Sequence, residues 1–500
     1  MIFRILVALI ISACSTLPDS IEPLPEQFAL PAATTGTLAD IGASIIHTHE
    51  PAESGFHLLE NNADALNWRL ALIDEAVSSL DLMYYLWHAD DSGRLLLKRV
   101  IQAADRGVSV RLLIDDLLLT NDDRVLMALD QHPNIQFRIF NPWKNRKVGR
   151  VVEFVASMDR LNSRMHNKLL IADTQATIWG GRNIGDNYFG LSDSYNFHDL
   201  DVLGFGPVAS EASNTFDHFW NSSWTISASV LPEDVDERFV ARKELQSLRK
   251  LQTSDSLEGF PLEPGDWSEE FGELVQKLHF GSSRFIYDTI ENGQLVGGLT
   301  EPLGSILSTA DREILLVNAY IIPDQDFIDE LRRLVNRGVH VRILTNSLAS
   351  HDVPAVNSHY QKWRKPILET GAELYELRPD AAIKKGVDTP PVRSEFIGLH
   401  IKAFVVDRHR IFIGSMNFDP RSVNINSEMG VTIDSATLGA ELARRTNWYM
   451  EPENAWQVRL TNEGKLIWID SEKTLTRQPA RSIWQRFMNG FFRLLPESQF

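Results

Sequence analysis

The pattern of apolar and polar positions predicts two similar α/β segments in one chain. A helical pattern ends at Arg106-Gly107 and leads into an apolar strand over residues 110–114. The same order returns at Arg337-Gly338, which precedes an apolar strand over 341–344 at an offset of 231 residues. Glycine at these helix ends favours a left-handed cap. Strands and helices alternate in both segments, which predicts a largely buried mixed sheet with helices on both faces.

A second repeated pattern carries reactive side chains. His166, Lys168 and Asp173 form the first copy, and a Gly-Gly-Arg-Asn sequence after them ends at Asn183. The second copy lies 234 residues later and contains His400, Lys402, Asp407 and Asn417. A single His-x-Lys pair is a weak signal, whereas two complete copies at one spacing indicate a duplicated functional unit.

The repeats divide the chain into five expected segments. Acidic, proline-containing sequence between the two copies predicts a connector. The expected order is a lipoprotein-type signal peptide at 1–14, a tether at 15–55, a first half at 56–225, the connector at 226–275 and a second half at 276–500. An amphipathic helix is predicted at the C-terminal end of the second half.

The first residues resemble a bacterial secretion signal. The apolar run over residues 5–11 is too short to cross a bilayer as a helix. The sequence Ile-Ser-Ala-Cys that ends at Cys14 resembles a lipoprotein box, in which the cysteine is acylated and becomes the mature N-terminus. This predicts a lipoprotein of the bacterial cell envelope that faces the periplasm, and Ser15 favours the outer membrane. The alternative is a cleavable signal with an incidental cysteine.

Composition narrows the classes of function. Lys plus Arg number 49 and Asp plus Glu number 67, so the 500-residue chain has a net charge of −18, which disfavours nucleic acid as a partner. A hydrophobic fraction of 43% excludes a disordered chain, and a single cysteine excludes an internal disulfide. No spacing of His, Cys or carboxylates is typical of a metal site, so neither a metal nor a cofactor is expected.

The repeated His, Lys and Asn side chains suit the cleavage of a phosphodiester. His and Lys are two residues apart on a predicted strand, so both emerge from the same face. The glycines that follow let the backbone turn, so that Asn presents its amide to the same space. One neutral imidazole can attack phosphorus, and a second, protonated imidazole can protonate the leaving alkoxide. Two Lys and two Asn can bind the non-bridging oxygens as charge spreads over them.

These motifs resemble those of the phospholipase D superfamily, and flanking residues such as 184–190 and 417–422 resemble its bacterial cardiolipin synthase C group. The resemblance runs from about residue 60 to the C-terminus. It implies an α/β fold of two pseudo-symmetric α/β/α domains, packed face to face with one shared active site. It also implies a covalent phosphohistidine intermediate, with His166 as the nucleophile and His400 as the general acid.

The resemblance implies transfer of a phosphatidyl group onto phosphatidylglycerol, with phosphatidylglycerol or phosphatidylethanolamine as the donor. A hydrolytic phospholipase D that releases phosphatidic acid is an alternative, because the sequence does not decide whether water or a lipid hydroxyl accepts the group. A phosphodiesterase or nuclease of the superfamily is disfavoured by the pI of 5.3 and the secretion signal. A lipid-binding lipoprotein without activity is disfavoured by the intact His and Lys pairs.

Carboxylates outside the motifs are expected to orient the imidazoles. In the family an acidic residue follows each motif, and the matching positions are Asp199 and Glu428, with Asp201 as an alternative to Asp199. A carboxylate bound to the far ring nitrogen fixes the tautomer and stabilises the imidazolium. Asp173 and Asp407 point away from His and Lys by strand parity, so we interpret them as structural residues that bind backbone or a cation.

Three features of the sequence suggest contact with lipid. Residues 144–164 carry six Lys or Arg and two acids, which suits an anionic surface near a substrate entry and also a solvated loop. In the C-terminal tail, apolar side chains fall at helical spacing among arginines: Ile483, Trp484, Phe487, Met488, Phe491, Phe492 and Leu495. Packing on their own domain is favoured over membrane contact for this stripe. A third set fits a water-excluding channel or the core equally well: Tyr84, Tyr85, Trp87 and Tyr320.

Overall fold

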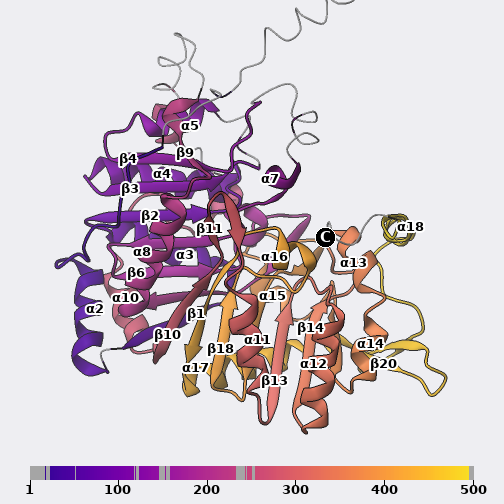
Figure 1. Cartoon of the computed structure of the whole chain (residues 1–500). Coiled ribbons are helices and arrows are strands. Elements are labelled where there is room, and N and C mark those ends of the chain that lie inside the picture. The colour runs from indigo at the N-terminus through magenta and orange to yellow at the C-terminus, as the bar shows by residue number, and fades with distance from the viewer. Residues whose placement is uncertain are drawn as a thin grey trace, which may run out of the picture.

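The computed structural model describes residues 17, 23–50, 52–117, 119, 123–145, 153, 158–231, 243, 245–250 and 254–494. The signal-peptide prediction for 1–14, including Cys14, lies outside these residues. Two α/β halves follow one another along the chain, the first indigo to magenta and the second orange to yellow in Figure 1. The predicted duplicated α/β fold is therefore confirmed.

The first half consists of a mixed sheet with helices on both faces. Its sheet strands are β1 (Glu53–Leu59), β2 (Ser79–Tyr84), β3 (Ser109–Asp115), β4 (Ile135–Phe140), β5 (Lys168–Ala172), β6 (Ala176–Gly180), β8 (Asp201–Phe205) and β9 (Thr225–Ser227). Its helices are α2 (Thr37–Thr48), α3 (Asn62–Glu75), α4 (Asp91–Asp105), α5 (Asp123–Asp130), α7 (Met158–Asn162) and α8 (Pro207–Trp220).

The second half repeats this order. Its sheet strands are β10 (His279–Tyr287), β13 (Glu313–Asn318), β14 (His340–Asn346), β15 (Glu373–Leu377), β17 (Lys402–Val406), β18 (Arg410–Gly414), β19 (Met429–Asp434), β20 (Ala455–Leu460), β21 (Leu466–Ile469) and β22 (Thr474–Leu475). Its helices are α11 (Thr300–Ser308), α12 (Gln325–Asn336), α13 (Pro354–Tyr360), α14 (Arg364–Glu369), α15 (Lys384–Val387), α16 (Pro420–Asn424), α17 (Ala436–Tyr449) and α18 (Ile483–Phe492). A hairpin of β11 (Thr289–Glu291) and β12 (Gln294–Val296) lies beside them.

The repeated Arg-Gly pairs end helices as predicted. Gly107 follows α4 with a φ of 103°, and Gly338 follows α12 with a φ of 88°. A residue with a side chain is strained in this left-handed region, so glycine allows the chain to turn at once into β3 or β14. Both turns lie at the N-terminal ends of equivalent strands, since β3 pairs in parallel with β2 and β14 pairs in parallel with β13.

The sheets of the two halves join edge to edge and form one continuous sheet. Antiparallel pairing of β1 with β10 joins them, with Phe56 opposite His279. The strand order is β9-β4-β3-β2-β5-β6-β8-β1-β10-β19-β18-β17-β13-β14-β15-β20-β21-β22. A short parallel pair, β7 (Tyr195–His198) with β16 (Phe396–Leu399), crosses between the halves a second time. The sequence did not predict this shared sheet.

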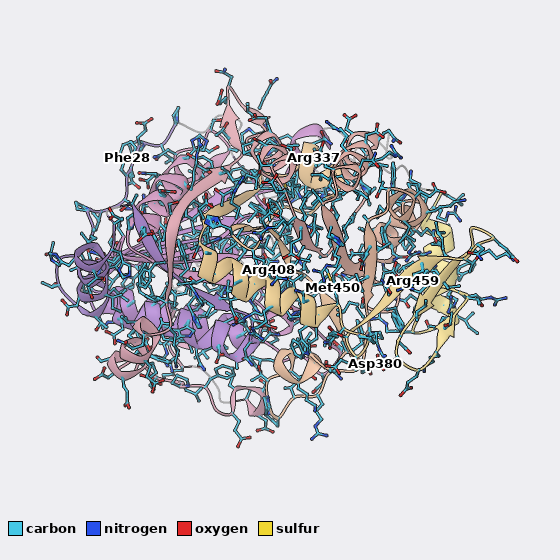
Figure 2. The ribbon with its side chains drawn as sticks, turned by 90° about the horizontal axis from the view of Figure 1, so that it is seen from below. Phe28, Arg337, Asp380, Arg408, Met450 and Arg459 are labelled. Atoms are coloured by element: carbon cyan, nitrogen blue, oxygen red, sulfur yellow. The ribbon has the colours of Figure 1, made fainter. Side chains whose placement is uncertain are left out.

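One apolar core extends through both halves. Helices α8 and α17 cover the same face of the sheet, and the side chains beneath them form a continuous cluster. Within it Trp179 of the first half lies against Phe285 of the second, with ring centroids 5.6 Å apart. Figure 2 shows this side of the molecule from below, where Met450 marks the end of α17. The opposite face carries a separate core in each half, under α3 and α4 and under α11 and α12.

The N-terminal segment differs from the predicted tether over 15–55. The Gln27 side chain accepts from Trp220 Nε1 at 3.1 Å, and the Ala29 amide donates to Asp217 at 2.8 Å, so this segment is fixed to α8. Helix α2 follows and buries an apolar face, including Leu38 and Ile45, against the first half. The tether prediction is wrong from Gln27 onward, because these residues are bound to the domain by hydrogen bonds and apolar contacts. It is also wrong at Leu17, which is buried in the same core and whose amide donates to the Lys144 carbonyl at 2.8 Å.

Part of the expected connector also packs on the first half. Leu257 and Phe260 join its core, and helix α10 (Ser268–Val275) buries Phe271 and Leu274 there. The Lys98 ammonium donates to the Leu262 carbonyl at 3.0 Å. Residues 254–275 are therefore an ordered extension of the first half that leads into β10.

Candidate active site

The two motif histidines lie directly before equivalent strands. His166 precedes β5 by two residues and His400 precedes β17 by two residues, while Lys168 and Lys402 begin those strands. The His166 amide donates to the Ser427 carbonyl at 2.9 Å, and the His400 amide donates to the His198 carbonyl at 2.8 Å. Both hydrogen bonds cross between halves, so the junction itself holds the backbone at the histidines.

Each imidazole also contacts a carboxyl group from the opposite half. His166 Nδ1 lies 2.9 Å from Glu428 Oε2, and His400 Nδ1 lies 2.6 Å from Asp199 Oδ2. A proton on Nδ1 that is donated to a carboxylate leaves the Nε2 lone pair free in the neutral ring. The two acids that family resemblance singled out are thus beside the rings. Asp201 is not, because it is buried in ion pairs with two arginines, Arg69 at 2.8 Å and Arg182 at 3.2 Å.

The two rings share one electrostatic environment. Burial lowers the pKa of His166 well below its usual value, and the positive charges of Lys168, Lys402 and His400 lower it further. Burial and Lys402 lower the pKa of His400 as well, whereas the charge of Asp199 opposes this change. Because charges in the second motif act on the histidine of the first, the two motifs form a single site.

The pKa values of the two carboxyl groups are shifted in opposite directions. Burial raises the pKa of Glu428 well above its usual value, and the charge of Lys168 only partly offsets this. Burial also raises the pKa of Asp199, but the charge and hydrogen bond of His400 outweigh burial, so this pKa lies below its usual value. The more acidic carboxyl group therefore faces His400, and the less acidic one faces His166. Ser415 donates a further hydrogen bond to Glu428.

Both motif lysines are buried and point back toward the histidines. Lys168 Nζ donates to the His166 carbonyl and Lys402 Nζ to the His400 carbonyl, each at 2.5 Å. Burial lowers the pKa of Lys402 to about 8 and that of Lys168 well below its usual value. An anion bound between them stabilises both ammonium groups, because an opposite charge raises the pKa of a buried lysine. The pair is suited to a phosphodiester anion.

The two motif asparagines have different partners. The Asn183 carbonyl oxygen accepts from the Leu86 amide at 3.2 Å, and its amide group donates to the Tyr188 hydroxyl at 2.9 Å. Asn417 is buried, and its carbonyl oxygen has no hydrogen-bond partner among the described residues. Asn183 thus fixes Tyr188, whereas Asn417 retains hydrogen-bonding capacity.

The motif aspartates lie at the far ends of their strands. The Asp173 carboxylate accepts from the amides of Val77, Ser78 and Ser79 at 2.7–3.2 Å. The Asp407 carboxylate accepts in the same way from the amides of residues 311–313 at 2.8–2.9 Å. Each aspartate lies five positions after its lysine, about 17 Å along the strand. Their geometry fits the structural interpretation and places them outside the group around the imidazoles.

Aromatic rings surround the histidines. The Tyr85 ring lies 4.9 Å from the His166 ring, and the Tyr320 ring lies 6.4 Å from the His400 ring. Tyr84 instead lies in the core, where its hydroxyl accepts from an arginine at 3.3 Å, and Trp87 packs edge-on against Tyr84. Of the four aromatics suggested for a channel, only Tyr85 and Tyr320 thus contact the histidine rings.

Tyr188 is a residue of the site that sequence reasoning did not single out. Its ring lies 5.3 Å from the His400 ring and its hydroxyl binds Asn183. Tyr188 lies five positions after Asn183, whereas Ser422 lies five positions after Asn417 in the second copy. The repeat therefore gave no signal for this tyrosine.

The basic stretch over 144–164 divides between described and undescribed residues. Arg164 is fully buried and pairs with Asp115 at 3.0 Å, and the Arg160 guanidinium donates to the Asn141 side chain at 2.6 Å. These two arginines are therefore fixed within the protein, which corrects the prediction of a lipid-facing role for them. Asp115 also accepts from the Met165 amide at 2.9 Å, so the Arg164 pair supports the residue before His166. Arg146, Lys147 and Arg150 lie outside the described residues.

In the part of the chain that the structure describes, no group of three or more His, Cys, Asp or Glu side chains is arranged to hold a metal ion. None of the helices formed by those residues is long and apolar enough to cross a bilayer.

Comparisons with known proteins agree with this geometry. A family model described as "Cardiolipin synthase, PLD-like domain" matches residues 70–220 and 303–450. The chain is 36% identical to cardiolipin synthase C of Escherichia coli (strain K12) over 464 residues, 90% of this chain and 96% of that one. It is 31% identical to a protein of Helicobacter pylori (strain J99) over 90% of each chain.

A solved structure shares the fold at low sequence identity. The crystal structure of phosphatidylserine synthase from Haemophilus influenzae is 14% identical, with a TM-score of 0.58 over 88% of this chain and 93% of that chain. The paired motifs, the matched residues and the level of identity over nearly the whole chain lead to one assignment. The chain belongs to the cardiolipin synthase family of phospholipase D-like proteins.

Proposed function

We propose that this protein is a phosphatidyltransferase that makes cardiolipin by way of a phosphohistidine. One observation carries the proposal: two buried imidazoles from different halves lie in one site, each bound to a carboxyl group, with two lysines beside them. A family relation to cardiolipin synthase C supports transfer to a lipid acceptor. The roles of the individual residues follow from the differences between the two rings.

In the first step, His166 attacks the phosphorus of a phosphatidyl donor. Its lowered pKa keeps the ring neutral at physiological pH, and a proton on Nδ1 directed to Glu428 leaves Nε2 as the nucleophile. The P–N bond forms as the bond from phosphorus to the headgroup oxygen breaks. Protonated His400 transfers its Nε2 proton to that oxygen, and ionised Asp199 stabilises the imidazolium. Lys168 and Lys402 stabilise charge on the non-bridging oxygens.

In the second step, a hydroxyl of phosphatidylglycerol accepts the phosphatidyl group. Neutral His400 removes the hydroxyl proton, the oxygen attacks phosphorus, and the P–N bond to His166 breaks. His166 is regenerated as a neutral ring and His400 as an imidazolium. The product is cardiolipin, and the first-step product is glycerol or ethanolamine, depending on the donor. Water in place of the lipid hydroxyl gives phosphatidic acid instead.

An apolar cavity supports a lipid substrate. It has a volume of about 490 Å³ and lies between α11, α12 and the segment 416–424. Met416 and Phe418, which flank Asn417, contribute to its wall. The remaining lining is mainly aliphatic and aromatic, with Leu303, Leu307, Ile314, Leu316, Ile322 and Phe327. We propose that this cavity accepts an acyl chain of a phospholipid whose phosphate lies at the histidines.

Expression in bacteria that lack cardiolipin tests the function. Wild type should restore cardiolipin in extracted lipids, and His166→Ala expressed at the same level should not. Purified wild-type protein incubated with phosphatidylglycerol vesicles should then release glycerol and cardiolipin. Phosphatidic acid as the main product in that assay would favour hydrolysis, and no lipid product from folded protein would contradict both activities.

We propose further that Cys14 anchors the protein to a bacterial envelope membrane on its periplasmic side. Leu17 is already buried on the first half and its amide donates to the Lys144 carbonyl at 2.8 Å, so the chain from Cys14 to the folded protein reaches at most about 10 Å. Radiolabelled palmitate should enter wild type and not Cys14→Ser, and membrane fractionation of both should show which membrane holds the protein. Label in both proteins would contradict acylation at Cys14.

A further inference from the structure

Helix α18 has its polar side buried and its apolar side exposed. Gln485 and Asn489 are 7% and 3% exposed. The exposed side chains are large and apolar, namely Ile483 at 87%, Trp484 at 67%, Phe487 at 60%, Phe491 at 52% and Leu494 at 81%. A helix that packs on its own domain shows the reverse arrangement. This overturns the prediction of inward packing for Ile483, Trp484, Phe487 and Phe491. Met488 and Phe492 are half-buried, and Leu495, the last member of the stripe, lies outside the described residues.

Specific hydrogen bonds hold α18 in this orientation. Gln485 Nε2 donates to the Leu348 carbonyl at 2.6 Å, and the Asn489 amide donates to Gln361 at 3.4 Å. Ser482 caps the first turn by accepting from the Gln485 amide at 3.0 Å. The helix lies against α13 at the periphery of the second half (Figure 1). Buried, bonded amides on one side fix which side faces outward.

The segment around α18 is strongly cationic. Residues 473–494 contain no Asp or Glu and five positively charged side chains, Lys473, Arg477, Arg481, Arg486 and Arg493. The protein as a whole has a net charge of −18. Basic side chains beside exposed Trp, Phe and Leu are typical of helices that lie in the interface of an anionic bilayer. The positive charge and the exposed apolar side chains of this segment thus both suit an anionic bilayer.

A chain of contacts leads from α18 through a loop and Tyr320 to His400. Gln485 binds Leu348, and three residues later the His351 ring stacks on the Tyr320 ring at 5.1 Å. The Tyr320 hydroxyl donates to Asp352 at 2.8 Å, and its ring lies 6.4 Å from the His400 ring. The loop that receives the helix therefore also holds Tyr320, whose ring lies beside His400.

We propose that α18 is an interfacial helix that docks onto an anionic phospholipid bilayer and places the active-site entrance beside Tyr320 at the membrane surface. The proposal rests on the proposed function, since it assigns the source of the lipid substrate. The exposed apolar residues enter the acyl boundary, and the exposed Arg477 and Arg493 bind lipid phosphates. The Gln485 contact transmits the position of the helix to the loop over 347–352.

The test compares two pairs of substitutions in full-length protein that carries Cys14→Ser, so that acylation does not contribute. One variant is Trp484→Ser with Phe487→Ser. The matched control is Trp448→Ser with Phe28→Ser, which removes a Trp and a Phe that are 41% and 68% exposed elsewhere. Co-sedimentation is measured with vesicles of phosphatidylglycerol and phosphatidylcholine in equal amounts, at low and high salt.

The α18 variant should bind these vesicles at least about tenfold more weakly than the control, and high salt should weaken binding by the control. The activity of the α18 variant on vesicles should fall in parallel with its binding. Its activity on short-chain phosphatidylglycerol dispersed as monomers should stay within about twofold of the control. Vesicle binding equal to the control would overturn the proposal. So would an equal loss of activity on the monomeric substrate, because α18 would then act through the fold.

Two measurements distinguish lipid docking from dimer formation and from a failure of the proposed function. If light scattering shows a dimer that the α18 variant dissociates, while vesicle binding is unchanged, a second copy covers the helix and the proposal fails. If the control protein is inactive on both substrates, the proposed function fails, and vesicle binding alone still decides whether α18 docks on lipid.

Discussion

The carboxyl groups that contact the two imidazoles of the site have pKa values shifted in opposite directions. His400 faces ionised Asp199, which favours its protonated form, and His166 faces Glu428, whose pKa is raised by burial. An acid and a nucleophile need opposite protonation states at the same pH. The surroundings of the two rings thus support His400 as the acid and His166 as the nucleophile.

Replacement of Asp199 by Asn should shift the alkaline limb of the pH profile. The charge of Asp199 raises the pKa of His400, so its removal lowers that pKa, and the protonated form is lost at lower pH. The alkaline limb of kcat/KM should move down by about 1 pH unit. Glu428→Gln should move this limb less, because Glu428 contacts His166 and not His400. Equal shifts in the two variants would contradict the assignment.

Loss of the acid should trap the covalent intermediate. With a phosphatidyl donor that has a nitrophenol leaving group, departure needs no proton, so His400→Ala should still form the P–N bond. Release to an alcohol acceptor should be slowed by about 100-fold or more, because no base remains. Denatured His400→Ala should retain radiolabelled phosphate that is lost in acid, after a burst of nitrophenol equal to the enzyme present.

The double variant His166→Ala/His400→Ala and the single variant His166→Ala are the controls for this experiment. Neither should retain label, because neither has the attacking nitrogen. Label on His166→Ala at the same level as on His400→Ala would reverse the roles of the two rings.

At the scale of single residues, the duplicated motif predicted the histidines and the lysines, and the family resemblance predicted the two acids beside them. It did not predict which acid serves which ring, because those contacts cross between halves and depend on the β1–β10 junction. Tyr188 was missed because the second copy carries Ser422 at that position. Arg164 was misread because a buried pair with Asp115 is indistinguishable in sequence from a surface charge.

Among the elements, helix α11 offers a way to test the apolar cavity. Gly304 lies on its wall, and a Cβ atom added there meets no atom within 4 Å. Gly304→Trp should obstruct the cavity and raise KM for long-chain phosphatidylglycerol by about fivefold or more, with kcat within about twofold. The measurement is initial rate against lipid concentration for long-chain and short-chain substrates.

Gly272→Trp on α10 is the matched control, because this glycine is also helical and equally open around an added Cβ atom. It should leave KM unchanged for both substrates. A Gly304→Trp variant that loses activity equally on short and long chains would show that the cavity does not receive an acyl chain.

Helix periods were predictable from the sequence, but the surroundings of a helix were not. The C-terminal stripe was found by its spacing, which suits a core and a lipid surface equally. Only the burial of Gln485 and Asn489 distinguishes the two. In the same way, the lipoprotein-type start of the chain led us to expect a tether over 15–55, although Gln27 and α2 find partners on the first half.

For the whole molecule, the continuous sheet predicts that both halves unfold together. Phe285 of the second half packs against Trp179 of the first within the shared core. Phe285→Ala should lower the free energy of unfolding by about 3 kcal/mol, because it leaves a cavity between the halves. Calorimetry should show one transition in wild type and the same single transition at lower temperature in the variant. Two resolved peaks, of which only one moves, would contradict this.

Covalent linkage of the halves has an evolutionary consequence. If each half were encoded separately and paired with an identical copy, symmetry would force the same acid beside both rings. A fused chain is free of this constraint, so aspartate can accompany one histidine and glutamate the other. The two imidazoles can therefore acquire different roles in a chain with two fused halves, whereas they cannot in a symmetric homodimer.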